Sequence, residues 1–306
     1  MSIVSLRPHR VAQLVLVPTI LLTVIGVYGS MLWTLQISFT SSGLLPTGKF
    51  IGLEQYFKLF EQDRWHVSYR NMFVLGGIYM FTCLAFGLLL AIAMDQGVRA
   101  KNVLQTIFLY PIALSFIVTG LAWRWVLNPT TGLEYFVQGL GFSGFKFNLL
   151  NNPELAIFTL VIAAVWHGSG LMMAIIFAGL QSVDSELWRA SRVDGIPKFT
   201  MYRRVILPML LPVFLTCIVL LAMGVVKSYD LVVAMTGGGP GYSTDLPAKF
   251  VVDHLFDRAN IGRASAAAVL MLLTVIALLV LSSVATRLRK HSQSDQGAKP
   301  EQGNKS

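Results

Sequence analysis

Residues 155–180 read LAIFTLVIAAVWHGSGLMMAIIFAGL, an apolar run of 26 residues that contains no Lys, Arg, Asp or Glu. A helix rises about 1.5 Å per residue, so about 20 apolar residues are enough to cross the roughly 30 Å hydrocarbon core of a membrane. The run therefore predicts a transmembrane helix.

Runs of this kind recur along the chain. We count six, at residues 11–36, 72–94, 103–127, 155–180, 207–235 and 264–285. The chain of 306 residues is 55% hydrophobic and 13% charged, with a mean hydropathy of +0.65, which is more apolar surface than a water-soluble core can hide. These features predict an all-α integral membrane protein with about six transmembrane helices in a single domain over residues 11–290.

The basic residues predict which side of the membrane each segment occupies. With six spans, fourteen Lys and Arg side chains fall on the side of the two termini and eight on the other side. Basic residues accumulate on the cytoplasmic side, so residues 1–10 and the tail 291–306 are expected in the cytoplasm. The tail is polar and is expected to be disordered. Spread over four short segments, the basic residues do not indicate a nucleic-acid-binding module.

The sequence carries no motif for catalysis or metal binding. It has no phosphate-binding loop of the Gly-x-x-x-x-Gly-Lys-Ser/Thr type and no His-Glu-x-x-His zinc motif. Cys83 and Cys217 both lie inside predicted spans, where a single thiol behaves as a small apolar group. We therefore expect neither an enzyme nor a chain that binds its own cofactor or metal.

The segment between the fourth and fifth runs, residues 182–206, has the pattern of two short helices joined by a turn. Asp184 is suited to cap the first helix, with Glu186 near its positive end. Gly195 can adopt the left-handed conformation that ends a helix, and Pro197 fits the first turn of the next one.

The same segment combines large apolar side chains with basic ones. Trp188, Phe199 and Tyr202 stand among five basic residues. Two interpretations fit this pattern: the segment inserts into a socket on another protein, or it lies in the lipid interface.

This segment resembles the conserved cytoplasmic loop of permease subunits in binding-protein-dependent ATP-binding-cassette (ABC) importers. That loop reads Glu-Ala-Ala, three residues, Gly, nine residues and Ile-x-Leu-Pro. Ala190, Gly195 and Val205-Ile-Leu-Pro208 match it in order and spacing. Arg189 stands where the family has Glu, and Ser191 where it has Ala.

The resemblance implies that the loop is a coupling helix seated in a cleft of the ATPase subunit. The reversed charge at Arg189 implies that the socket on this ATPase is altered there. The coupling residues implied are Glu186, Arg189, Ala190, Ser191, Asp194, Gly195, Leu207 and Pro208.

A second resemblance covers nearly the whole chain. Residues 228–244, 50–56 and 122–129 resemble sugar permeases of the maltose-importer type, as the first-type subunit. This implies a multi-pass protein of the bacterial inner membrane that pairs with a second permease, two ABC ATPase subunits and a periplasmic sugar-binding protein. The ATPase subunits would bind ATP and Mg²⁺. The implied substrate is a sugar, either a glucose-like monosaccharide or a small glycoside.

Polar side chains inside the predicted spans are candidates for the substrate pathway. A charge at Lys227 or Asp230 would cost at least about 2.5 kcal/mol if it faced lipid alone. Their three-residue spacing allows either an ion pair on one helix face or a place along the route of a sugar. Trp166, His167 and Tyr229 offer the aromatic faces and hydrogen-bonding groups that bind sugars, although a buried, hydrogen-bonded role is the simpler one for His167.

Short segments connect the spans on the side opposite the termini. Residues 40–71, 128–154 and 236–262 are each expected to carry a short surface helix. The last of them begins with a glycine-rich stretch that frees the backbone for a turn or a close approach. In the resembled family this stretch faces the binding protein, and a plain helix terminator explains its glycines equally well. Its residues are Thr236, Gly237, Gly238, Gly239 and Pro240.

A stand-alone channel or a proton-coupled secondary carrier is the alternative function. Asp230 would be the proton-carrying group of such a carrier. A carrier has no use for a coupling-type loop, so the importer is the favoured interpretation.

Overall fold

The computed structural model describes residues 8–97 and 101–297. These residues form helices and no β-strand, and a single isolated antiparallel bridge joins Thr40 to Phe50. The chain divides into two compact units, residues 1–63 with 250–271 and residues 64–249 with 272–306. The all-α prediction is confirmed.

The first unit begins with one long helical run. α1 (Pro8–Thr23), the π-helix η1 (Val24–Gly29) and α2 (Ser30–Ser38) follow one another without a break. Residues 16–38 are long and apolar enough to cross a membrane, and their large apolar side chains are mostly exposed. Such a helix is stable only where lipid or another apolar surface covers it.

The rest of the first unit packs around the start of α15 (Ile261–Gly297), close to α3 (Glu54–Phe60). The Gly262 amide donates to the Ser42 carbonyl at 2.9 Å. A Cβ on Gly262 would lie 2.7 Å from the carbonyl oxygen of Thr40, so only glycine allows this approach.

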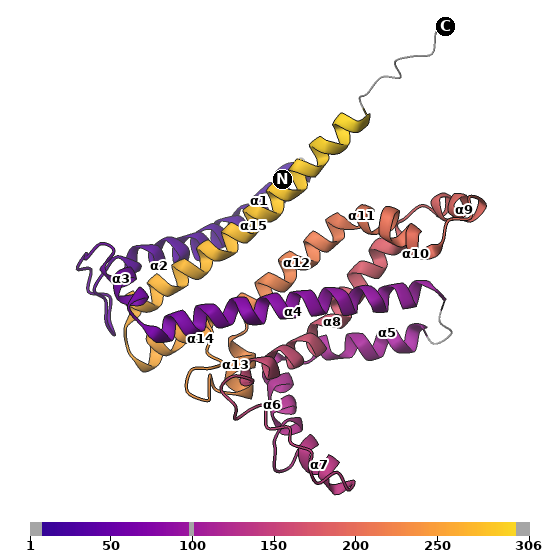
Figure 1. The fold of residues 1–306 in the computed structure, drawn as a ribbon. Coiled ribbons are helices and arrows are strands. Elements are labelled where there is room, and N and C mark those ends of the chain that lie inside the picture. The colour runs from indigo at the N-terminus through magenta and orange to yellow at the C-terminus, as the bar shows by residue number, and fades with distance from the viewer. Residues whose placement is uncertain (1–7, 98–100, 298–306) are drawn as a thin grey trace, which may run out of the picture. The chain divides into compact units, whose positions relative to one another are not determined.

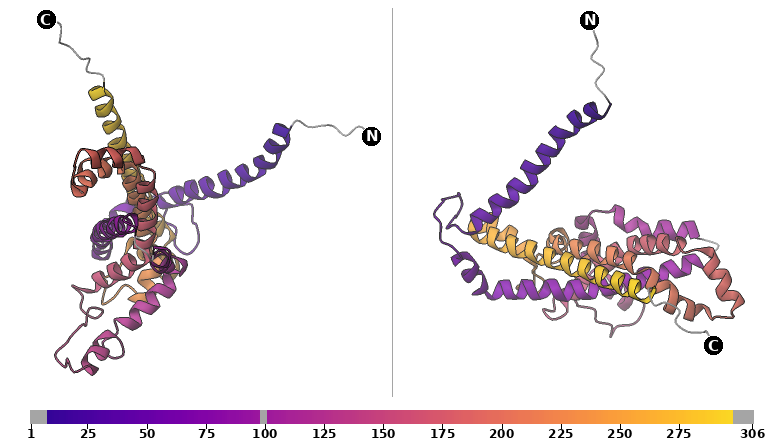
Figure 2. Two further views of the ribbon diagram at one scale, coloured as in Figure 1. Left: turned by 90° about the vertical axis from the view of Figure 1, so that its right-hand side faces the viewer. Right: turned by 90° about the horizontal axis from the view of Figure 1, so that it is seen from above.

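The second unit is built on α8 (Ala156–Gln181), which packs against α4 (Asp63–Asp95), α5 (Lys101–Leu109) and α12 (Leu211–Val226). Figures 1 and 2 show these helices running alongside one another. Along α8, Leu160, Met173 and Ile176 are fully buried. The uncharged apolar run at residues 155–180 therefore forms the centre of this unit.

Small residues let the helices of the second unit approach closely. A Cβ on Gly170 of α8 would lie 1.8 Å from the Phe108 carbonyl oxygen at the end of α5, and one on Gly87 of α4 would lie 2.7 Å from the Met172 Cβ. Both positions exclude a side chain because the opposing atoms belong to backbone or to a buried Cβ.

The third predicted span, residues 103–127, is not one straight helix. α5 continues into the 3-10 helix η2 (Tyr110–Ala113), and α6 (Phe116–Val126) then leaves at an angle of 103°. Ser115 lies between them in an extended conformation, and its Oγ accepts a hydrogen bond of 3.3 Å from the Val118 amide. A capping serine therefore starts a new helix where the apolar pattern alone indicated a continuous one.

The fifth predicted span, residues 207–235, is broken twice. It begins with α11 (Leu207–Met209), which continues α10 (Lys198–Met201) and η3 (Tyr202–Ile206), and α12 follows after a bend of 65°. α12 ends at Val226, and α13 (Tyr229–Met235) is a separate helix. Prolines in this stretch remove backbone donors, which favours such breaks.

Four helices of the described residues are long and apolar enough to cross a membrane alone, and six are if each bent pair counts as one span. The predicted short helices in the connecting segments are present as α3, α7 (Leu133–Gly139) and α14 (Pro247–Val252). The tail was expected to be disordered from residue 291, but α15 continues to Gly297. Residues 1–7 and 298–306 lie outside the described residues.

Candidate functional site

The segment after α8 forms the predicted pair of short helices, α9 (Ser185–Val193) and α10. Asp184 caps α9, with its Oδ1 accepting a hydrogen bond of 2.8 Å from the Glu186 amide. Pro197 precedes α10 at its N-cap and is not in its first turn as predicted. The pair is therefore specified mainly by local residues, because each helix end carries its own signal.

Gly195 makes the turn between the two helices. Its φ is +66°, in the left-handed region that favours glycine. The Gly195 amide donates to the Arg192 carbonyl at 3.4 Å, and the Ile196 amide donates to the Ser191 carbonyl at 2.9 Å. This is the Schellman arrangement, and it confirms the role predicted for Gly195.

Two aromatic residues of the pair point inward. The rings of Trp188 in α9 and Tyr202 in η3 meet edge to face, with centroids 5.3 Å apart. The Tyr202 hydroxyl donates to Asp95 Oδ2 at 3.0 Å, at the end of α4. This hydrogen bond ties the helix pair to a helix that begins more than a hundred residues earlier in the chain.

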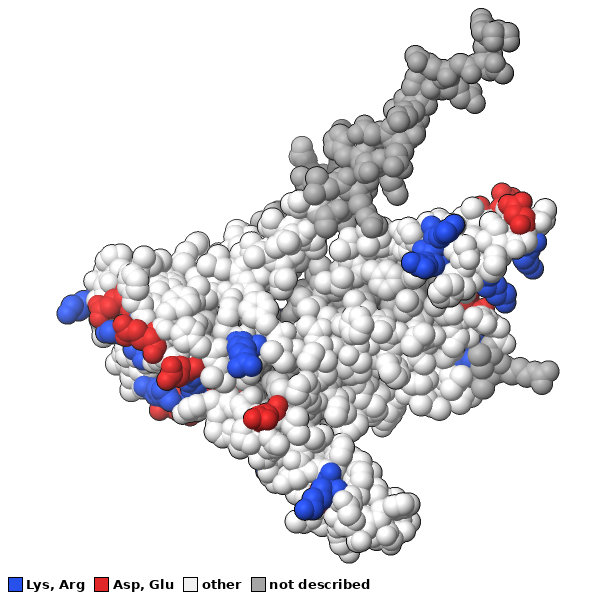
Figure 3. All heavy atoms as spheres, in the orientation of Figure 1, with Lys and Arg blue, Asp and Glu red and all other residues white. Residues whose placement is uncertain are grey.

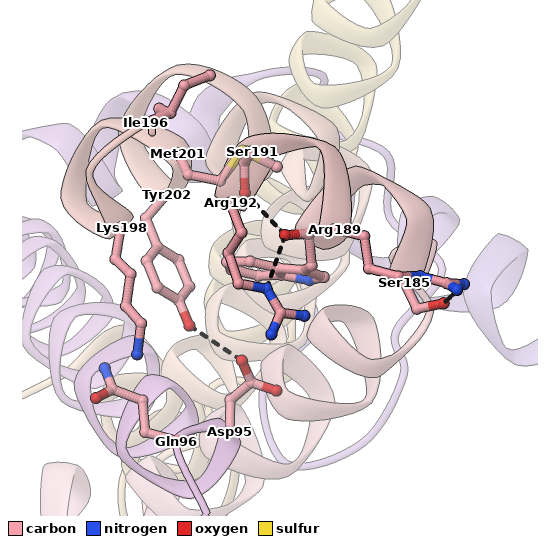
Figure 4. Close-up of a pocket in the computed structure, with 11 residues that line it drawn as sticks. Asp95, Gln96, Ser185, Arg189, Ser191, Arg192, Ile196, Lys198, Met201 and Tyr202 are labelled. Carbon is pink, nitrogen blue, oxygen red and sulfur yellow. Dashed lines mark hydrogen bonds between the residues drawn. The ribbon is translucent and has the colours of Figure 1, made fainter. Parts of the chain in front are cut away.

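A pocket of about 600 Å³ lies between the helix pair and the end of α4. Figure 4 shows Asp95 and Gln96 on one wall, facing Arg192, Lys198 and Tyr202 on the other. Sequence reasoning missed Asp95 and Gln96, since no local pattern connects the end of α4 with this loop.

Other side chains of the pair point outward. Val193 is 86% exposed and Phe199 is 74% exposed. Figure 3 shows charged side chains gathered at this tip, whereas the adjoining surface of α12 carries none. Of the three large side chains Trp188, Phe199 and Tyr202, only Phe199 is exposed, so it alone could insert into a partner or the lipid interface without a rearrangement of the pair.

The coupling residues predicted from the sequence lie on this tip and on the helix that follows it. Glu186, Arg189 and Ala190 are exposed on α9, Asp194 is exposed at its C-cap, and Ser191 is buried. Leu207 and Pro208 belong to α11, which ends just before the 65° bend that leads into α12. One continuous segment thus connects the exposed tip with α12.

Replacing Tyr202 with Phe is expected to lower the free energy of unfolding by about 1 kcal/mol, because it removes the hydrogen bond to the Asp95 carboxylate and keeps the ring. Titration with SDS in detergent micelles measures this difference. Tyr135→Phe is the matched control, since Tyr135 is 65% exposed. Equal effects of the two substitutions would show that the bond to Asp95 contributes nothing.

The candidate pathway residues on α8 face different surroundings. His167 is buried, its ring lies tilted by 30° against that of Phe116 with centroids 4.2 Å apart, and its Nδ1 is 3.2 Å from the Thr119 hydroxyl. Trp166 is 39% exposed and meets Trp123 edge to face. His167 therefore has the buried, hydrogen-bonded role, and Trp166 retains an accessible ring.

Of the two alternatives for Lys227 and Asp230, the ion pair is not formed between these two described residues. The helix ends at Val226, so Lys227 and Asp230 do not share the face of one helix. Both side chains are exposed, and Tyr229 is partly buried. α13, which carries Tyr229 and Asp230, packs against α6 and α8.

The glycine-rich stretch after α13 folds into a compact loop. Gly237 and Gly238 have φ of +64° and +94°, which a residue with a side chain rarely adopts. The Thr236 and Thr244 hydroxyls are 2.7 Å apart, and Thr244 also donates to the Gly239 carbonyl at 2.9 Å. The stretch therefore ends α13 and also returns the chain toward α4.

A buried ion pair holds this loop on α4. Arg64 Nε lies 2.6 Å from Asp245 Oδ2, and the Asp245 side chain is fully buried. Ser68 donates to the same oxygen at 3.1 Å, and Asn71 Nδ2 donates to the Ser243 and Asp245 carbonyls at 2.9 and 3.0 Å. Sequence reasoning missed this group, whose members lie far apart in the chain.

The model of one protein family, described as the binding-protein-dependent transport system inner membrane component, matches residues 84–295. This stretch contains α8, the α9–α10 pair and the loop after α13. The chain belongs to this family of inner membrane components.

Curated relatives of this inner membrane component are also transport proteins. A probable ABC transporter permease protein of Pyrococcus horikoshii is 34% identical and is aligned over 86% of this chain and 91% of its own. The xylose/arabinose import permease protein XacH of Haloferax volcanii is 32% identical, over 85% and 82%. The chain is thus an ABC importer permease.

A solved structure has the same fold as this permease. The crystal structure of a bacterial ABC transporter involved in the import of the acidic polysaccharide alginate matches with a TM-score of 0.80 and 19% identity, covering 90% of this chain and 95% of that one. The chain therefore shares its overall fold with a transporter chain that has been solved.

The permease departs from the family loop at two positions, and each has a structural account. Ser191 Oγ donates to the Trp188 carbonyl at 3.1 Å, so the buried hydroxyl is satisfied within its own helix. Arg189 is exposed and donates to the Ser185 hydroxyl at 3.1 Å.

Among the described residues, no group of His, Cys, Asp and Glu could hold a metal ion.

Proposed function

We propose that this permease forms half of the membrane pathway of a sugar importer and that the α9–α10 pair is the seat for its ATPase subunit. The observation that carries the proposal is the pair itself: a tightly turned tip with Val193 and Phe199 exposed, continuous with a helix of the membrane domain. A bare apolar side chain on a charged tip is typical of a protein interface.

The pair is well placed to transmit motion. Tyr202 links it to the end of α4, and α11 links it to α12. A displacement of the tip would therefore move two helices of the second unit together. Closure of the ATPase subunits on ATP would tilt these helices and alternate the pathway between inward and outward openings.

The proposed substrate is a glucose-like monosaccharide or a small glycoside. Two relatives support a sugar: the xylose/arabinose permease, and the trehalose/maltose transport system permease protein MalF of Thermococcus litoralis, which is 25% identical over 93% of this chain. Within the chain, Trp166 and Tyr229 provide aromatic faces for sugar rings. We place the route beside α6, α8 and α13, which carry or contact these residues.

The proposed assembly contains a second permease, two ABC ATPase subunits and a periplasmic sugar-binding protein. ATP and Mg²⁺ bind to the ATPase subunits. Both termini and the α9–α10 tip face the cytoplasm, and the loop at residues 236–240 faces the binding protein. The excess of basic residues on the side of the termini supports this orientation.

Purification of this chain after expression with its genomic neighbours tests the proposal. We expect an ATPase to co-purify and its activity in proteoliposomes to rise with one sugar when the binding protein is present. A chain that purifies alone and moves solute along a proton gradient would contradict the proposal in favour of a secondary carrier.

A further inference from the structure

A second pocket, of about 460 Å³, lies where α6 and α13 end. Its walls come from the end of α6 and the turn after it, from residues 150–151, and from the glycine-rich loop. This volume is within the range of pockets that hold small ligands. Neither the α9–α10 pair nor the aromatic residues of α8 contribute to it.

The pocket offers hydrogen-bond donors. Arg124, Asn128 and Asn151 line it. Asn128 Oδ1 already accepts from the amide and the hydroxyl of Thr130, at 2.9 and 2.7 Å, which leaves its Nδ2 donors for another group. The Asn151 side chain and the Arg124 guanidinium form no hydrogen bond or ion pair with described residues. Two separate segments, the end of α6 with the turn after it and residues 150–151, thus present unused donors to one space.

The charge of the pocket restricts its ligand. Arg124 is exposed and positive, and no Asp or Glu is among the described residues that line the pocket. A cationic ligand would be repelled, whereas hydroxyl or carboxylate oxygens would accept hydrogen bonds from the guanidinium and the amides.

The pocket lies at one end of α13, and two of the candidate pathway residues lie at the other. Met235 and Thr236 line the pocket, and Tyr229 and Asp230 begin the helix. A helix of seven residues is about 10 Å long, which is roughly the length of a disaccharide. Gly120 of α6 packs directly against Ala234 of α13, so the two helices that end at the pocket are held together.

We infer that this pocket is a reception site, where a neutral or acidic sugar released by the binding protein is held by Arg124, Asn128 and Asn151 before it moves along α13. The inference rests on the proposed function. It adds a sugar site at the mouth of the route, distinct from the aromatic residues of α8, and it excludes amino sugars as preferred ligands.

Cysteine labelling tests the site. The two natural cysteines are both buried, so a Thr130→Cys variant adds one accessible thiol to the pocket. The complete transporter in proteoliposomes is labelled with a membrane-impermeant maleimide in the presence of the binding protein. The labelling rate is compared with and without a sugar. The sugar used is the one among xylose, glucose, maltose and glucuronate that stimulates the ATPase most. Ser143→Cys, exposed in the segment after α7 and outside the pocket, is the matched control.

We expect the sugar to slow labelling of Thr130→Cys about tenfold, as for a site that is nine-tenths occupied, and to leave Ser143→Cys unchanged. Adding Arg124→Gln should abolish this protection. Glucosamine, which is cationic, should give none. Unchanged labelling of Thr130→Cys, equal protection of both cysteines, or protection that persists with Arg124→Gln would overturn the inference.

Two further arms of the experiment separate the possible failures. One tests whether the pocket binds lipid in place of sugar, and the other tests the proposed function independently of the reception site. If Arg124 holds a lipid phosphate, labelling in the absence of sugar will slow as anionic lipid is added to the vesicles, and sugar will have no effect; this outcome overturns the inference. If no sugar stimulates the ATPase, the proposed function fails. A transporter that responds to sugar without protection at Thr130→Cys refutes the reception site alone.

Discussion

Replacing Arg64 with Leu is expected to lower the free energy of unfolding by about 3–5 kcal/mol, because it leaves the Asp245 carboxylate buried without its counter-ion. Asp245 is fully buried, and the Ser68 hydroxyl alone cannot balance its charge. A loss of this size approaches the whole stability of a marginal protein. The variant should therefore accumulate poorly, and SDS titration of the fraction that folds measures the loss.

The control for this substitution is Arg70→Leu. Arg70 lies on the same helix, carries the same charge and is exposed, so its replacement should change stability by less than about 0.5 kcal/mol. Combining Arg64→Leu with Asp245→Leu should recover part of the loss, since no charge is then left buried. An Arg64→Leu variant as stable as Arg70→Leu would show that the ion pair does not hold the glycine-rich loop.

Replacing Gly195 with Val should leave the protein inserted and folded but reduce sugar-stimulated ATP hydrolysis at least about tenfold, which corresponds to about 1.4 kcal/mol. A β-branched residue does not adopt a φ of +66° without strain, so the turn must open and the tip must change direction. Hydrolysis in proteoliposomes with sugar and binding protein measures the effect.

Two variants separate the conformation of Gly195 from its small size. Gly195→Asn should keep most of the activity, because Asn tolerates the left-handed region. Gly144→Val, in an open loop position without a positive φ, should be silent. If Gly195→Val hydrolyses ATP normally, or if Asn and Val have equal effects, the turn at Gly195 is not what positions the ATPase.

Local signals in the sequence predicted the α9–α10 pair well. Asp184 caps α9, and Gly195 adopts the left-handed conformation, as their residue types indicate. Each of these features depends on a few neighbouring residues, so one sequence is enough to recognise it. Leu207 and Pro208 were instead assigned from the resemblance to the family loop, and they lie in α11.

Hydrophobicity alone could not show how two of the spans are broken. Ser115 and the prolines near Leu210 interrupt runs whose composition is uniformly apolar, and the apolar pattern predicted single helices there. A further break, between α12 and α13, keeps Lys227 and Asp230 off a shared helix face. The Ser115 cap could have been recognised from its residue type, whereas the bend angle depends on packing against α8.

Long-range partners were also beyond the sequence. Arg64 lies in α4 and Asp245 in the loop before α14, and neither has a neighbour in the chain that indicates the other. The same holds for Tyr202 and Asp95, and for the donors that meet around Arg124. Such groups become visible only when the fold brings their segments together.

Photo-crosslinking from position 199 tests the central claim most directly. Phe199 is 74% exposed at the α9–α10 tip, and p-benzoylphenylalanine at this position reacts with whatever surface covers it. In the assembled transporter we expect a crosslink to the ATPase subunit, with none from Phe142, which is similarly exposed in the segment after α7. Crosslinks from position 199 to lipid alone, or to the ATPase equally from both positions, would contradict the role of this helix pair as the seat of the ATPase.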